Sequence, residues 1–185
     1  MNKNKILLVV FCLSLSLFLV LFSYKIVFNF SHYEAEQKEI IDFLQGKGNL
    51  TAKMTTAEAT HLEEVKGVMR RMDYVFYFLL LLGSLIFTYS YKDKEQLRKL
   101  LLYGGITAFG LVLLILIFVG LDFNWLFRSF HQVFFPQGNW MFAADSYLIQ
   151  TFPLDFFISI TWKIIGLNLF LAVIFIWGSL YFRKG

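Results

Sequence analysis

The chain has 185 residues, of which 58% are hydrophobic, 19% aromatic and 16% charged, and its mean hydropathy is +0.62. Soluble domains carry about 25% charged residues, so this balance indicates a membrane protein. The formal net charge is +4, but Lys and Arg gather at the ends of apolar runs, which indicates membrane topology and argues against a nucleic-acid surface. The single cysteine, Cys12, excludes a disulfide framework and a cysteine metal cluster.

Four apolar runs are long enough to cross a membrane, which requires about 20 residues of helix. The first run follows a basic segment, as in a signal peptide, but no cleavage site follows it, so we expect an uncleaved anchor. These runs predict an all-α membrane protein, with a single membrane domain over 1–185 and four transmembrane helices. The predicted spans are about 6–27, 74–90, 100–121 and 156–181.

Basic residues predict which side of the membrane each connector occupies. Three short basic groups lie at the ends of the runs: Lys3 and Lys5; Lys92, Lys94, Arg98 and Lys99; and Arg183 and Lys184. The long segment 28–73 also contains Lys and Arg, but its acidic residues outnumber them. With four spans all three groups lie on one side, and positive charge marks the cytoplasm. We therefore expect cytoplasmic termini and two extracytoplasmic connectors, about 28–73 and 122–155, which form a small cap.

The first connector is expected to contain two helices. "NFSHYEAEQKEIIDFLQGKGN" predicts a short amphipathic helix that ends at Gly46 and Gly48. "TTAEATHLEEVKGVMRRMDYVF" begins another, with Thr55 as N-cap and Glu58 three residues later, as in a capping box. Apart from Gly67 nothing interrupts this pattern, so we expect one helix to stand above the membrane and continue into it. The apolar side of the short helix is Ile40, Ile41, Phe43 and Leu44.

The stretch "FHQVFFPQGNWMFAADSYLIQTFP" (130–153) is too interrupted for a membrane helix. Its Gly138-Asn139 pair predicts a tight turn that folds "FFP" back against "WMF". Trp140 is expected to anchor the loop at the interface, and as part of a site it would contact lipid. Asp145 either orients a histidine ring or caps a helix that begins at "SYLIQTF".

All three histidines, His32, His61 and His131, fall in the two connectors. Histidine changes charge near neutral pH, so one ring can accept a proton and another donate one. Joined across a shallow pocket at the outer membrane surface, His61 and His131 would form a proton-transfer site. Taken singly, each is an interfacial aromatic ring with a solvated nitrogen, the interpretation adopted for His32. No nucleophile elbow or metalloprotease motif occurs, which favours a substrate that supplies its own nucleophile.

Two segments together point to a family. "HLEEVK" (61–66) and "FHQVFFPQGNWMFAADSYLIQTFPLDFF" (130–157) resemble the signatures of a bacterial family of four-span membrane proteins, the lipoprotein intramolecular transacylases (Lit). The resemblance covers essentially the whole chain, and Glu64 stands where the family pattern more often has Asp. It implies an acyltransferase of the bacterial cell membrane, without a cofactor. Such an enzyme moves the sn-2 acyl chain of a lipoprotein's S-diacylglyceryl group to the α-amine of its N-terminal cysteine.

The resemblance also implies site residues, with the essential histidines at the positions matched by His61 and His131. We expect His131 to take the proton from the attacking amine, and His61, aided by Lys66, to stabilise the oxyanion or hold the ester; the exchanged assignment of the two histidines stays open. Supporting roles are expected for a carboxylate that orients an imidazole and for an aromatic side chain at the substrate. These supporting residues are Glu64, Asp145 and Trp140.

The expected partners are diacylated lipoproteins and membrane lipid, without nucleic acid. Two alternatives stay open at this point. One is a non-enzymatic membrane sensor or assembly subunit, in which both histidines are dispensable. The other is a membrane hydrolase whose metal is held by His61, His131 and a carboxylate, a ligand set chemically adequate for zinc.

Overall fold

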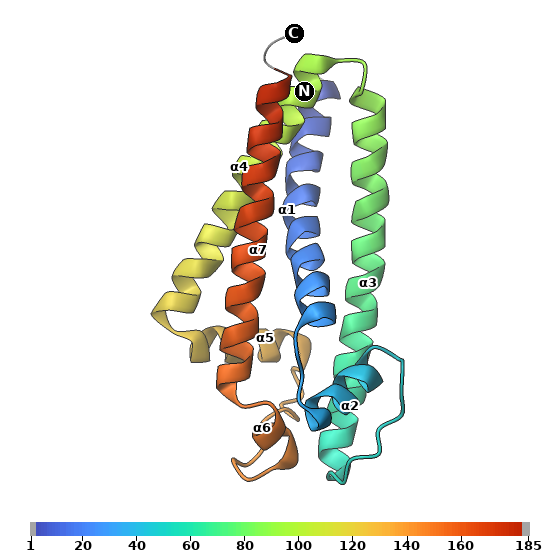
Figure 1. Ribbon diagram of the computed structural model, residues 1–185, viewed down its shortest axis with the longest axis vertical. Coiled ribbons are helices and arrows are strands. Elements are labelled where there is room, and N and C mark those ends of the chain that lie inside the picture. The colour runs from blue at the N-terminus through green and yellow to red at the C-terminus, as the bar shows by residue number, and fades with distance from the viewer. Residues whose placement is uncertain (1–2, 183–185) are drawn as a thin grey trace. The chain divides into compact units, whose positions relative to one another are not determined.

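A computed structural model describes residues 3–182 of the chain (Figure 1). Within these residues every regular element is a helix, and four helices are long and apolar enough to cross a membrane. The predicted all-α class with four membrane helices is therefore confirmed. The helices are α1 (Lys3–Phe30), α2 (Ala35–Leu44), α3 (Thr56–Ser90), α4 (Lys94–Leu121), α5 (Phe123–Phe134), α6 (Tyr147–Thr151) and α7 (Leu154–Tyr181).

The four long helices extend beyond the predicted apolar runs. α1 already begins at Lys3 and α4 at Lys94, because a helix continues through polar residues once it has left the hydrocarbon. α3 contains both the capped segment of the first connector and the second apolar run, and Gly67 does not interrupt it. The expectation of one helix that continues from the connector into the second span is confirmed.

The chain forms two compact units. Unit 1 comprises 1–29, 74–117 and 162–185, and unit 2 comprises 30–73 and 118–161. Unit 1 therefore contains most of the apolar length of α1, α3, α4 and α7. Unit 2 contains α2, α5, α6 and the polar first half of α3.

Apolar side chains from all four long helices form the core of unit 1. Two adjacent glycines of α4 allow the helices to approach closely. A Cβ atom on Gly104 would lie 2.8 Å from Leu15 Cδ2 of α1, and one on Gly105 would lie 3.0 Å from Ala172 O of α7. Small residues have this role between membrane helices, where packing drives association. The core residues are Phe11, Leu15, Leu19, Ile86, Leu97, Leu100, Ala108 and Ala172.

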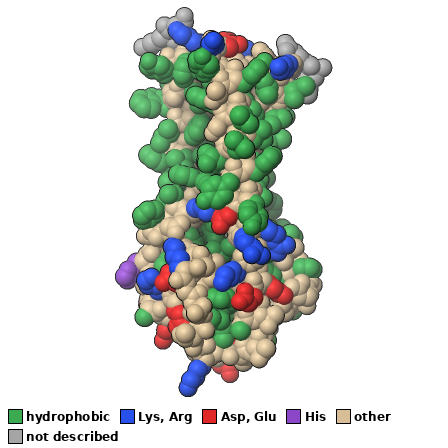
Figure 2. All heavy atoms as spheres, turned by 90° about the vertical axis from the view of Figure 1, so that its right-hand side faces the viewer, with side chains coloured by type: hydrophobic (Ala, Val, Ile, Leu, Met, Phe, Trp, Pro, Cys, Tyr) green, Lys and Arg blue, Asp and Glu red, His purple; other side chains and the backbone are tan. Residues whose placement is uncertain are grey.

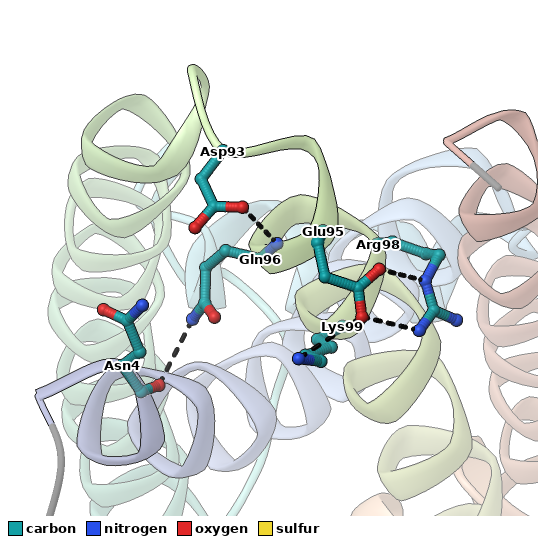
Figure 3. A network of polar contacts seen from close by, with 6 residues as sticks. All are labelled: Asn4, Asp93, Glu95, Gln96, Arg98 and Lys99. Carbon is teal, nitrogen blue, oxygen red and sulfur yellow. Dashed lines mark hydrogen bonds and ion pairs between the residues drawn. The ribbon is translucent and has the colours of Figure 1, made fainter. Parts of the chain in front are cut away.

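One end of unit 1 brings the start of α1 beside the turn that joins α3 to α4. Gln96 Nε2 donates a hydrogen bond to the backbone oxygen of Asn4 over 3.2 Å (Figure 3), and Lys3 Nζ lies 4.6 Å from the centroid of the Tyr89 ring. Two of the three basic groups thus share this end, as the charge pattern requires. The third group, Arg183 and Lys184, lies outside the described residues.

Charge and apolar surface are distributed differently on the two units. Hydrophobic side chains cover much of the flank of unit 1 that Figure 2 shows, whereas acidic and basic side chains are interspersed on unit 2. Exposed apolar side chains of α3 include Phe78, Leu81 and Leu85. A large exposed apolar surface on long helices is what contact with lipid requires.

In unit 2, α2 follows the sequence prediction closely. Its buried residues are Ile40, Ile41, Phe43 and Leu44, which are the predicted apolar side. The helix ends before Gly46, which adopts the left-handed conformation (φ 72°) that favours glycine after a helix. α2 is linked to α6 by Gln37 Nε2, which donates to the backbone oxygen of Thr151 over 2.9 Å.

The second connector contains more helix than the interrupted sequence suggested. α5 begins after Asp122, whose side chain accepts a hydrogen bond from the backbone N–H of Trp125, and it continues to Phe134. It is strongly amphipathic, and Val133 is 74% exposed, as expected of a helix that lies in a membrane interface. The first five residues of 130–153 are thus helical, and the helix ends before Pro136 and Gly138, so the stretch forms no continuous membrane helix.

The cap of α6 differs from the sequence expectation. Ser146 occupies the N-cap position, and its side chain accepts a hydrogen bond from the backbone N–H of Ile149. Asp145, which the sequence suggested as a cap, precedes this position and is exposed. A serine hydroxyl caps as well as a carboxylate, so the choice between neighbours depends on where the backbone turns into the helix.

Candidate active site

The first half of α3 brings His61 to the site. Residues 56–73 contain seven charged side chains, too many for hydrocarbon, so this half lies outside the spanning part of the helix. At its start Thr55 N donates to Glu58 Oε2 over 2.8 Å, and Glu58 N donates to Thr55 Oγ1 over 3.3 Å. The predicted capping box is thus confirmed. The charged residues are Glu58, Glu63, Glu64, Lys66, Arg70, Arg71 and Asp73.

Glu58 does more than cap the helix. Glu58 is only 2% exposed, and its Oε1 accepts a hydrogen bond from Leu148 N over 3.0 Å. Burial raises the pKa of this carboxyl, but the hydrogen bonds from Leu148 and Thr55 outweigh it and hold the pKa below its usual value. An ionised carboxylate therefore joins the start of α3 to the start of α6.

The structure brings the two predicted histidines together. The ring centroids of His61, on α3, and His131, in the last turn of α5, lie 6.3 Å apart with their planes at 31°. Aromatic rings surround both: Phe135 lies 4.8 Å from His61 and Trp140 lies 4.9 Å from His131, between centroids. His61 is only 7% exposed. The pair therefore lies in largely apolar, desolvated surroundings.

The backbone of α5 fixes the tautomer of His131. Its Nδ1 lies 2.8 Å from the backbone oxygen of Phe127, one helical turn earlier. A carbonyl oxygen can only accept, so Nδ1 carries the proton and donates. In the neutral ring Nε2 then keeps its lone pair, as a general base requires.

The surroundings of the two rings lower both pKa values. Burial lowers the pKa of His61, and the neighbouring His131 lowers it further. The negative charge of Glu64 raises it by less, so the pKa of His61 falls from 6.5 to about 4. Burial also lowers the pKa of His131, while the hydrogen bond to Phe127 raises it. Both rings are therefore neutral at pH 7, and the contact with Phe127 favours His131 as the ring that accepts a proton.

Glu64 lies beside His61 and is held by the second connector. One carboxylate oxygen accepts from Gln137 Nε2 over 2.9 Å, and the other from Asn139 Nδ2 over 2.7 Å. The latter oxygen, Oε2, is 4.0 Å from His61 Nδ1, within ion-pair range but beyond a hydrogen bond. Gln137 and Asn139 were not predicted as site residues, although they flank Gly138, whose left-handed backbone (φ 76°) shapes this loop.

Three polar atoms at this site are buried without a hydrogen-bond partner among the described residues. They are His61 Nδ1, Asn139 Oδ1 and Trp140 Nε1. An unpaired buried donor or acceptor costs about 1–3 kcal/mol, so native proteins retain few. Their grouping around the histidine pair indicates that polar groups of a bound molecule or of water complete the site.

The two other predicted site residues lie elsewhere in unit 2. Lys66 Nζ lies 4.0 Å from the centroid of the Phe43 ring of α2, and Asp145 is exposed. Among the described residues, no hydrogen bond or ion pair joins either side chain to His61 or His131. Within 3–182 there is also no group of three or more His, Cys, Asp or Glu side chains arranged to hold a metal ion.

Known protein families and solved structures include relatives of this chain. The family model described as lipoprotein intramolecular transacylase Lit matches residues 5–157. A solved structure of the membrane integral lipoprotein intramolecular transacylase Lit from Bacillus cereus superposes with a TM-score of 0.86 at 19% sequence identity. That alignment covers 98% of this chain and 96% of the other. No curated protein sequence matches the chain significantly.

Two further solved structures of the B. cereus protein carry a substitution of a histidine, by arginine in one and by alanine in the other. Each aligns with a TM-score of 0.81 at 18% identity and covers 98% of this chain, with 92% and 94% of the other chain covered. At such identities the similarity establishes the fold. The family match includes both histidines and all of the second connector. The chain therefore belongs to the Lit family of lipoprotein intramolecular transacylases and is a membrane acyltransferase that acts on lipoproteins.

Proposed function

We propose that this enzyme moves the sn-2 acyl chain of a lipoprotein's S-diacylglyceryl group to the α-amine of the same N-terminal cysteine. The product is an N-acyl, S-monoacylglyceryl lipoprotein. The observation that carries the proposal is a neutral histidine pair, with His131 held in the tautomer of a base. Because the substrate contains both nucleophile and ester, the absence of a nucleophile motif in the sequence fits a direct transfer without an acyl-enzyme intermediate.

In this reaction the amine nitrogen attacks the ester carbonyl carbon, the N–C bond forms, and the bond from that carbon to the glycerol oxygen breaks. His131 Nε2 accepts the proton that the attacking nitrogen loses and returns it to the departing glycerol oxygen. The ring ends neutral, as it began. Proton and charge therefore balance without a cofactor.

The tetrahedral intermediate carries an oxyanion that needs hydrogen-bond donors. We assign this role to a ring N–H of neutral His61 and to the indole N–H of Trp140, which is buried without a partner among the described residues. A neutral histidine with a strongly lowered pKa is a suitable donor, because it gives up no proton to the oxyanion. Removal of one such donor typically costs about 10²–10³ in rate.

Positioning accounts for a further part of the rate. Reactions between groups held in one molecule gain up to about 7–11 kcal/mol relative to their bimolecular counterparts. The enzyme then has to fold the lipid headgroup so that amine and ester meet at the histidine pair. Glu64, fixed by Gln137 and Asn139, supports this arrangement as a carboxylate within ion-pair range of His61.

We place the active site on the extracytoplasmic side of the bacterial cell membrane, with both termini in the cytoplasm. The basic start of α1 and the basic turn before α4 share one end of unit 1, and positive charge favours the cytoplasm. His61 lies between the first and second spans, and His131 between the third and fourth. With four spans, both connectors lie on the side of the membrane opposite to the basic groups. Reporters fused to either terminus, active only in the cytoplasm, test this orientation and would be silent if it were inverted.

The function is tested in a bacterium that makes only diacylated lipoproteins. Expression of this chain should convert N-terminal lipopeptides to the N-acyl, S-monoacylglyceryl form, as read by tandem mass spectrometry. His131→Ala and His61→Ala should abolish the conversion, and a chelator should leave it intact. Unchanged lipopeptides with the folded wild-type protein would contradict acyl transfer, and loss of a chain without its transfer, sensitive to chelator, would indicate a metal hydrolase.

A further inference from the structure

The unpaired polar atoms of unit 2 are confined to one place. Among its described residues, the buried side-chain nitrogen or oxygen atoms without a partner belong to His61, Asn139 and Trp140 alone. The proposed reaction uses His61 and Trp140 as donors to the oxyanion. The acceptor, Asn139 Oδ1, has no role in that chemistry.

The orientation of the Asn139 side chain follows from its contact with Glu64. Its Nδ2 lies 2.7 Å from Glu64 Oε2, and a carboxylate oxygen accepts a hydrogen bond from nitrogen but offers nothing to an amide oxygen. The amide therefore presents Oδ1 as its second, unpaired polar atom. The same Glu64 oxygen lies 4.0 Å from His61 Nδ1, so a single atom connects Asn139 to the histidine pair.

An acceptor beside a carboxylate suits a cationic donor. Asn139 Oδ1 can only accept, and the negative charge of Glu64 lies one hydrogen bond away. A free α-amine is mostly protonated near neutral pH and carries several N–H donors. An acylated amine has one N–H and no charge, and a chain without the amine has neither.

We propose that Asn139 Oδ1, supported by Glu64, binds the free α-amine of the substrate's N-terminal cysteine and makes the enzyme selective for an unblocked amino terminus. This inference rests on the proposed function and adds a specificity-determining residue to it. An amide oxygen does not take up a proton in this range of pH, so Asn139 holds the nitrogen without competing with His131 for its proton. The bound ammonium first releases one proton to water. The neutral amine then keeps one N–H on Oδ1 while its lone pair attacks the ester and its other N–H proton passes to His131.

Binding without turnover provides the test. Three lipopeptides with ether-linked chains, which cannot transfer an acyl group, differ only at the amino terminus: free amine, N-acetyl and des-amino. Their dissociation constants are measured for the purified full-length protein in lipid nanodiscs. The wild type should prefer the free amine over the des-amino compound by about 10-fold or more, the range of a charge-assisted hydrogen bond.

Three variants separate binding from support of Glu64. Asn139→Leu removes Oδ1 and should abolish the preference for the free amine. Asn139→Asp keeps an acceptor at that position but loses the donor to Glu64, and it should retain the preference. Gln137→Leu is the matched comparison: it removes the other donor to Glu64 and leaves Asn139 intact, so it should keep a preference for the free amine and reduce it less than Asn139→Leu does.

The outcomes are distinct. A full preference for the free amine in folded Asn139→Leu overturns the inference, as does its loss in both Asn139→Asp and Gln137→Leu. The N-acyl product in cells, read separately, decides the proposed function. If the protein prefers the free amine but no N-acyl product forms in cells, the amine-binding site is supported and the proposed reaction is contradicted. If the product forms but the protein shows no preference for the free amine, the reaction is supported and the amine-binding site is contradicted.

Discussion

The two units of this protein use buried polar groups in opposite ways. In unit 1 the buried Ser23, Ser90 and Asn168 have side-chain atoms without a hydrogen-bond partner within 3–182, and they come from three separate helices. In unit 2 the unpaired atoms of His61, Asn139 and Trp140 surround one pair of imidazoles. Scattered polar groups belong to the packing of a bundle, whereas a cluster of them marks a place where another molecule supplies the partners.

The contacts that hold the units also differ in their range along the chain. Unit 1 relies on apolar side chains and on close approach at Gly104 and Gly105. Unit 2 relies on hydrogen bonds between distant segments, such as Gln37 to Thr151 and Glu58 to Leu148. Changes in unit 1 should therefore alter stability, and changes in unit 2 should alter chemistry.

The largest effect is expected from His131→Ala. Loss of the general base should lower the rate of acyl transfer by about 10² to 10⁴-fold, with the helical circular dichroism unchanged. The measurement is the initial rate of N-acyl product formation by purified protein in nanodiscs. A variant that retained more than about a tenth of the rate would exclude His131 as the base.

The next effect concerns Glu58. Glu58→Ala leaves Leu148 N and the donors of Thr55 without their acceptor, at about 1–3 kcal/mol for each buried group, so both thermal stability and acyl transfer should fall. Glu58→Gln keeps the volume and an amide oxygen for Leu148, and its loss should be clearly smaller. Thermal unfolding and initial rates of the two variants check this, and equal behaviour would show that the link between α3 and α6 is unimportant.

A glycine pair tests unit 1 in the same way. A Cβ on Gly105 would meet Ile176 Cγ1 at 2.7 Å and Ala172 O at 3.0 Å, so Gly105→Ala should destabilise the bundle by about 1–3 kcal/mol. Gly110, on the same helix, has nothing within 4 Å of an added Cβ, and Gly110→Ala is the matched control. Thermal unfolding in detergent should separate the two, and equal melting temperatures would contradict close packing at Gly105.

Local patterns in the sequence were sufficient to predict the long helices and the cap of α3. Uninterrupted apolar length predicted the four spans, and the spacing of Thr55 and Glu58 predicted the start of α3. The apolar face of α2 followed from Ile40 and Ile41 at helical spacing. Each of these features depends on residues within a few positions of one another.

The rest of the site depends on residues far apart in the chain. Nothing near Glu64 in the sequence indicates that Gln137 and Asn139 bind it, and nothing near Glu58 indicates Leu148. Lys66, five positions after His61, contacts Phe43 of α2, a partner that its own neighbours do not reveal. Long-range hydrogen bonds are selected by the packed fold, so sequence spacing could propose the histidine pair but not the side chains that support it.

A smaller effect is expected from pH. The pKa of His61 is lowered from 6.5 to about 4, so its neutral form stabilises the folded state above pH 6.5 and this contribution is lost as pH falls towards 4. The melting temperature should drop over this range, and less so in His61→Gln, which cannot titrate. A nuclear magnetic resonance titration of the ring proton should place the His61 midpoint near 4. A midpoint at or above 6.5 would contradict the desolvated environment.

The smallest effect is expected from His32→Gln. This substitution tests whether a histidine must be buried beside other site residues to take part in catalysis. His32 belongs to unit 2, as His61 and His131 do, but it is exposed, whereas His61 is buried. An exposed ring at this position has no desolvated neighbour to exchange a proton with, so its replacement should change the rate of acyl transfer by less than about two-fold, within the effect of an ordinary surface substitution. The same nanodisc assay measures it beside His61→Ala, which should lose most of its activity. A comparable loss in both variants would mean that the chemistry extends beyond the buried pair, and the contrast between a polar cluster and its surroundings would no longer locate the active site.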